Sequence, residues 1–155
     1  MGLRLIAIAA AFMPCLPAFA GDWAASEVEK TYAVGGRTGI ELYRSIGERG
    51  PKVGVGRVIA HTSFKLTWSR KYEPRDGACV LASARPRLTI TYTLPRPSQT
   101  LSADIQRKWR DFIEGVRAHE RVHGDFIKEM VRTIEAETVG LTVPDDPGCT
   151  RIKTE

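Results

Sequence analysis

The sequence predicts an α+β fold in which a small antiparallel sheet packs against one long C-terminal helix. Two observations support this fold class. Residues 58–69 and 79–94 alternate apolar and polar side chains, which is typical of strands that are buried on one face. From residue 102 to about residue 138, apolar side chains recur at helical spacing instead, over about ten turns.

The first twenty residues predict a secretory signal peptide. A basic start at Arg4 precedes an apolar stretch, "LIAIAAAFMPCL", and the small-residue cleavage site "PAFA". We therefore expect residues 1–20 to be removed and residues 21–155 to form a single domain. That domain would be periplasmic or secreted, with no membrane anchor after cleavage.

The charge of the chain argues against a nucleic-acid partner. Removing the signal peptide takes away one charged side chain, Arg4, so the formal net charge falls from +5 to +4. The remaining basic residues are scattered singly, without the basic run and interleaved aromatic residues of a nucleic-acid surface. We therefore expect no nucleic-acid binding.

A short strand and a short helix open the expected domain. "KTYAVGG" alternates around Tyr32 and Val34 and predicts a strand that ends in glycines. The next segment, "TGIELYRSIGERGP", predicts a helix. Thr38 stands three residues before Glu41, as in a capping box, and Gly50 and a proline stop the helix.

The two longer strands follow, separated by a predicted turn. "RKYEPRDGA", residues 70–78, is rich in turn-forming residues. Within the strand at residues 79–94, Pro86 either breaks the strand or marks an edge position, because proline has no N–H to donate. "PRPSQT" then ends the strand region.

Two cysteines, Cys79 and Cys149, remain after the signal peptide. An even number in an exported protein predicts a disulfide. Closing a loop of 70 residues (149 minus 79) would stabilise the fold by roughly 4 kcal/mol. The alternative is two free, buried thiols.

The segment "HERVH", residues 119–123, predicts a zinc site. His119 and His123 lie one helical turn apart, so both imidazoles can bind one Zn²⁺, and Glu120 lies beside a water on that metal as a general base. On a helical wheel all three fall in the apolar stripe, while Arg117 and Lys128 fall on the solvated side. Ionisable groups facing an apolar interior are costly unless something pairs with them, as a metal would. The alternative is that backbone carbonyls satisfy the histidines and an arginine pairs with Glu120.

A catalytic zinc ion needs a third protein ligand, and the sequence leaves its identity open. His61 lies on the first long strand, and Glu73 and Asp76 lie on the turn that follows it. Glu129 and Glu137 lie about 9 Å and 21 Å beyond His123 along the helix, so either would need a helix break to ligate.

The sequence also resembles a known bacterial family. "TYAVGGRTGIELYRSIGERGP", "AHTSFKLTW", a cysteine before a long strand, "TYTLP", a helix with "W…HERVH" and a late cysteine occur in this order. They resemble predicted secreted zinc-dependent proteases that are catalogued as a domain of unknown function. The resemblance spans Thr31 to Cys149 and implies a zincin-like fold, bound Zn²⁺ and peptidase activity.

We therefore expect a zinc-dependent peptidase with a peptide or protein substrate. The strand edge near Thr89 to Thr93 is a candidate for aligning an extended substrate by strand addition. One alternative is an exported binding module in which the metal is structural or absent. Another is a hydrolase of peptidoglycan cross-links, which would share the chemistry. The sequence leaves the oligomeric state open.

Overall fold

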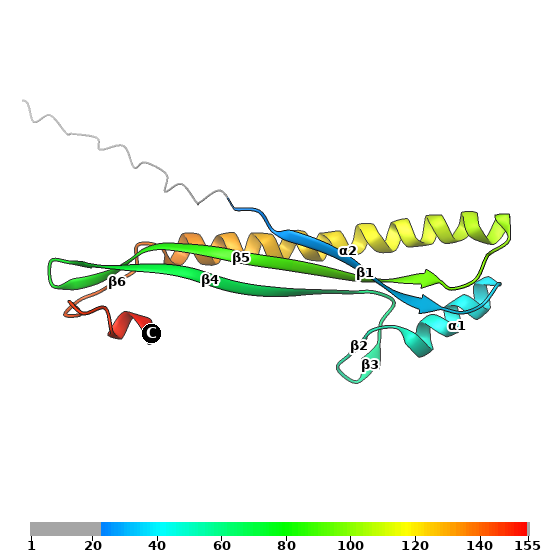
Figure 1. Cartoon of the computed structure of the whole chain (residues 1–155), viewed down its shortest axis with the longest axis horizontal. Coiled ribbons are helices and arrows are strands. Elements are labelled where there is room, and N and C mark those ends of the chain that lie inside the picture. Colours follow the sequence, from blue (N-terminus) through cyan, green and yellow to red (C-terminus); the bar gives the residue numbers. More distant parts are fainter. Residues whose placement is uncertain (1–22, 155) are drawn as a thin grey trace, which may run out of the picture.

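The computed structural model describes residues 23–154, so the predicted signal peptide lies outside the described residues. The fold is α+β, with a mixed sheet and one long C-terminal helix. In Figure 1, α2 lies along the sheet, α1 lies toward the opposite end of the long axis from the C-terminus, and the β2–β3 hairpin lies between α1 and the middle of the molecule. The elements in chain order are β1 (Ser26–Val34), α1 (Gly39–Arg49), β2 (Lys52–Val53), β3 (Gly56–Arg57), β4 (His61–Arg75), β5 (Ala78–Pro97), α2 (Ala103–Thr138), β6 (Thr142–Val143) and the 3₁₀ helix η1 (Arg151–Lys153).

No helix among residues 23–154 is both long and apolar enough to span a bilayer.

The main sheet is mixed, so the expectation of a purely antiparallel sheet was wrong. Its order is β1-β5-β4, with the short β6 at one end of β5. β4 is antiparallel to β5, but β1 is parallel to it, with Ser26 opposite Thr89 and Val34 opposite Pro97. Parallel partners need a long connection, and α1, the β2–β3 hairpin and β4 supply it here. Alternating side chains identify a strand but do not give its direction.

The turn between β4 and β5 is much shorter than predicted. Asp76 and Gly77 both have positive φ, 49° and 80°, and they form a two-residue hairpin turn. An Asp-Gly pair favours this kind of turn, because both central residues must adopt the left-handed region. Residues 70–75 therefore continue β4, and Arg75 pairs with Ala78.

The prolines of β5 lie where that strand has a neighbour on one side only. Pro86 pairs with β4, and the pairing of β5 with β1 begins only at Thr89. Pro95 and Pro97 pair with β1, beyond the last β4 pair at Thr93. Of the two alternatives for Pro86, the structure selects the edge position.

Both helices begin as the sequence indicates. At the start of α1, the Thr38 hydroxyl accepts from the Glu41 N–H at 3.3 Å, and the Glu41 carboxylate accepts from the Thr38 N–H at 3.1 Å. This is the predicted capping box. α2 runs without a break for 36 residues, about 54 Å.

Two small clusters of buried apolar side chains hold the layers together. One gathers on β5 and the later part of α2, and the other joins the end of β1, α1 and the start of α2. Between these clusters, the middle of α2 faces an open cleft. The buried members are Leu88, Ile90, Tyr92 and Val131 in the first cluster, and Val34, Leu42 and Ile46 in the second.

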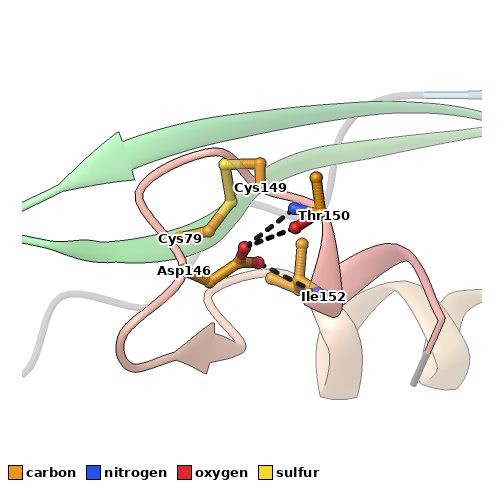
Figure 2. The surroundings of a disulfide bond; sticks show 5 residues. All are labelled: Cys79, Asp146, Cys149, Thr150 and Ile152. Atoms are coloured by element: carbon orange, nitrogen blue, oxygen red, sulfur yellow. Dashed lines mark hydrogen bonds between the residues drawn. A yellow bond between two sulfur atoms is a disulfide. The ribbon is translucent and has the colours of Figure 1, made fainter.

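A disulfide fastens the C-terminal tail to β5, as Figure 2 shows. Cys79 and Cys149 are joined, with their Cα atoms 5.2 Å apart. The buried Asp146 carboxylate accepts from the backbone N–H groups of Thr150 at 2.8 Å and Ile152 at 3.1 Å. These bonds fix the loop around the second cysteine.

Candidate metal centre

A cleft of about 980 Å³ lies between the middle of α2 and the start of β4. All three histidines of the chain, His61, His119 and His123, line it, although they come from a strand and a helix. The other lining residues are mostly apolar and come from the β2–β3 hairpin, the segment before β4, the start of β4 and α2. They are Val53, Arg57, Val58, Ile59, Ala60, Thr62, Phe64, Gly115, Val116, Glu120, Phe126 and Ile127.

The two histidines of α2 converge on each other. The Nε2 atoms of His119 and His123 are 3.1 Å apart, and both residues are exposed to the cleft. Two imidazole nitrogens bound tetrahedrally to one Zn²⁺ at about 2.05 Å would lie about 3.3 Å apart. The spacing of this pair therefore fits a shared zinc ion.

Glu120 is the one member of the trio that is buried. It is 7% exposed and lies where α2 meets the start of β4. Its carboxylate Oε2 accepts a hydrogen bond of 2.5 Å from the hydroxyl of Thr62. The partner of Glu120 is therefore a threonine and not the arginine that the alternative named. The expectation that His119 and His123 also face the core was wrong, because both are exposed and line the cleft, while Glu120 and Gly124 of the same stretch are buried against β4 and β5.

The structure narrows the choice of a third ligand. His61 is half-buried and lines the cleft. Glu73 and Asp76 lie at the far end of β4, roughly 40 Å along an extended strand. Glu129 and Glu137 are exposed, and α2 does not break to bring them back. Within residues 23–154, no three side chains of the metal-binding types lie close enough to hold one ion, so His61 lines the cleft without joining the pair.

Two ion pairs between β1 and α2 fix the helix on either side of the site. Lys128 Nζ lies 2.7 Å from the Glu27 carboxylate, and Arg117 Nε lies 3.0 Å from that of Glu29. These hydrogen bonds hold the pKa values of both glutamates below their usual range. Sequence analysis had placed Arg117 and Lys128 on the solvated side, but β1, which was expected to be shorter, reaches them. Tyr92 donates to Glu27 at 3.0 Å, and burial raises the pKa of Tyr92.

Sequence analysis missed two residues that shape the site. One is Thr62. It stands two residues before Phe64 and therefore lies on the same, apolar face of the strand, which was the available signal that its side chain points toward the helix. The other is Gly124, directly after the second histidine, where an added Cβ would overlap the hydroxyl of Tyr92. A glycine in the apolar stripe of a helix was the available signal, since a close approach of another backbone or side chain favours it.

The edge proposed for substrate binding is not free. The stretch of β5 from Thr89 to Thr93 pairs with β1 on one side and with β4 on the other. The strand addition expected there was therefore wrong. β4 is an outer strand of the sheet order, and its first residues line the cleft.

Comparisons with known proteins give a family without an assigned activity. A family model described as "Bacterial protein of unknown function (DUF922)" matches residues 29–155. No curated protein matches the chain, and no solved structure matches it either.

Proposed function

The chain belongs to the DUF922 family of bacterial proteins of unknown function, and we propose that it is an exported zinc-dependent peptidase, zincin-like in its site. One observation carries this proposal. The only three histidines of the chain line one cleft, and two of them place their Nε2 atoms 3.1 Å apart beside a buried carboxylate. These are the residue types and the spacing that a catalytic zinc site uses.

We assign His119 and His123 as two ligands of Zn²⁺ and His61 as the third. Of the candidates considered, His61 is the one that lines the cleft. It is the first residue of β4, and Ile59 and Ala60 before it belong to no strand. Its side chain can therefore turn toward the pair without disrupting the sheet.

Glu120 is the proposed general base. A bound zinc ion would polarise a peptide carbonyl and make a water more acidic. The Glu120 carboxylate takes a proton from the attacking water and passes it to the leaving amine. The apolar walls of the cleft, which include Ile59, Phe64 and Phe126, suit a bulky apolar side chain close to the scissile bond.

The test uses residues 21–155, as wild type and as variants. It measures the zinc content of each protein and its rate of hydrolysis of an unfolded protein substrate. Glu120→Gln should retain zinc and lose at least about 100-fold in turnover, the lower range for general acid–base catalysis. His119→Ala should lose zinc, and His61→Ala should weaken its binding by more than about tenfold. Glu129→Gln, an exposed carboxylate of the same helix, is the matched control and should behave as wild type.

A wild-type protein that takes up no zinc after dialysis against excess metal contradicts the proposal. So does a Glu120→Gln variant with wild-type turnover. Hydrolysis of cross-linked peptidoglycan peptides, but not of unfolded protein, would keep the chemistry and change the substrate.

A second candidate is an exported binding module in which the metal is structural or absent. Among the described residues, no third side chain lies within reach of the histidine pair, and this favours the form of that candidate without a metal, because a structural zinc site needs four protein ligands. The candidate predicts that the wild-type protein hydrolyses no peptide, whether or not it takes up zinc.

A further inference from the structure

A hydrogen bond from β4 reaches the proposed general base. Thr62 Oγ1 lies 2.5 Å from Glu120 Oε2 and 3.2 Å from the Glu120 carbonyl oxygen. A hydroxyl has one proton to donate. The shorter contact therefore identifies the carboxylate as the acceptor.

The sheet holds Thr62 rigidly in this place. Thr62 is a strand residue, and its branched Cβ restricts rotation about χ1. Its partner in register on β5 is Tyr92, which is buried and lies against Gly124 of α2. Two neighbouring strands thus contact α2 on either side of His123, and the hydroxyl cannot drift away from the carboxylate without disturbing both.

This arrangement gives the two oxygens of Glu120 different surroundings. The hydrogen bond described for the carboxylate uses Oε2. Within residues 23–154, no fully buried side-chain oxygen lacks a hydrogen-bond partner, so Oε1 keeps contact with the cleft that Glu120 lines. One oxygen is therefore anchored, while the other is free of that bond in a cleft that both histidines also line.

We propose that Thr62 is a positioning residue for the reaction, which anchors Oε2 so that Oε1 is aimed at the attacking water. The inference rests on the proposed peptidase function. A glutamate has three rotatable bonds, and without an anchor its carboxylate would sample orientations that do not reach the water. Misplacement of a reacting group by about 1 Å can cost on the order of 100-fold in rate.

The experiment uses zinc-loaded residues 21–155 and measures zinc content, kcat and KM on one apolar peptide. Thr62→Val, which keeps the shape and removes the hydroxyl, should lower kcat by about 10- to 100-fold. KM and zinc content should change by less than about twofold, since substrate and metal binding do not use this bond. Thr62→Ser keeps the hydroxyl and should recover kcat to within about threefold of wild type.

Two further variants isolate the cause. Thr67→Val makes the same replacement at an exposed position of β4 and should leave kcat unchanged. In a Glu120→Gln background, Thr62→Val should lower kcat by less than a further factor of about two. The effects of two residues that act through one group are not additive.

The outcomes separate the two proposals. If Thr62→Val has the kcat of the wild type while Glu120→Gln has a lowered kcat, the positioning role is overturned and the peptidase proposal stands. A Thr62→Ser variant as slow as Thr62→Val, or loss of zinc from Thr62→Val, assigns Thr62 to packing and also overturns the role. A wild-type protein without turnover overturns the peptidase proposal, and the role of Thr62 falls with it.

Discussion

Gly124 illustrates how a single residue sets the position of the histidines. It follows His123 directly and is buried where α2 lies against Tyr92. Glycine weakens a helix by about 1 kcal/mol relative to alanine. The chain accepts this cost at a position where any side chain would overlap the tyrosine.

Replacing this glycine should therefore destabilise the protein in spite of the gain in helix propensity. Gly124→Ala forces the Tyr92 ring or the helix to shift, and overpacking of this kind costs about 1–3 kcal/mol. The measurement is urea unfolding, followed by zinc titration of the folded variant. Gly115→Ala is the matched control on the same helix, because its new Cβ would meet nothing within 4 Å. Gly115→Ala should stabilise the protein by up to about 1 kcal/mol, and equal stability of the two variants would refute the argument.

Residue types alone made part of the site predictable. The spacing of His119, Glu120 and His123 along the sequence is a local property, and α2 preserves it. Thr62 and His61 reach the same cleft only because β4 crosses α2 at this point. The residue pattern of either segment does not show that the two segments meet there, so the partner of Glu120 could not be predicted.

At the scale of elements, the helices were predictable and the strand arrangement was not. Periodicity and the Thr38 capping box located both helices, because these signals lie within a few residues of each other. The parallel direction of β1 and its ion pairs with α2 depend on contacts between segments far apart in the chain. Such contacts leave no trace in the pattern of a single segment.

The ion pair of Glu27 with Lys128 gives the β1–α2 contact a pH dependence. The lowered pKa of Glu27 means that its stabilising effect is present above the ordinary value of 4.5 and is lost as the pH falls through the lowered pKa. The pair is partly exposed, so we expect Glu27→Gln to cost about 0.2–1 kcal/mol at neutral pH. Urea unfolding should show this difference narrowing as the pH falls below the ordinary value of 4.5. Glu48→Gln, at an exposed position of α1, controls for the loss of one negative charge, and a difference that stays constant in acid would contradict the assignment.

At the scale of the whole molecule, the disulfide and the cleft lie far apart. The disulfide lies at one end of β5, and Tyr92 beside the site lies 13 residues further along (92 minus 79), roughly 40 Å on an extended strand. Stability and metal binding should therefore respond differently to the loss of the bond.

Replacing both Cys79 and Cys149 by alanine should lower the free energy of unfolding by up to roughly 4 kcal/mol, because the unfolded chain gains the freedom of a 70-residue loop. Zinc content measured well below the unfolding temperature should stay at the wild-type value. Thermal unfolding with and without a reductant, for the wild type and the variant, provides the check. Loss of zinc from a variant that is still folded would show that the two ends of the molecule are coupled.

The parallel pairing of β1 with β5 also decides when the molecule can assemble during synthesis. β1 is made early, but its partner stretch, Thr89–Pro97, emerges only after α1, the β2–β3 hairpin and β4. Pairings between such distant segments carry a loop-closure cost before they give any stabilisation, and chains rich in them fold slowly. A ribosome must therefore deliver most of this chain before the sheet closes, and the histidines of α2 arrive later still. The cleft, which needs both β4 and α2, can therefore form only when nearly all of the chain has been made.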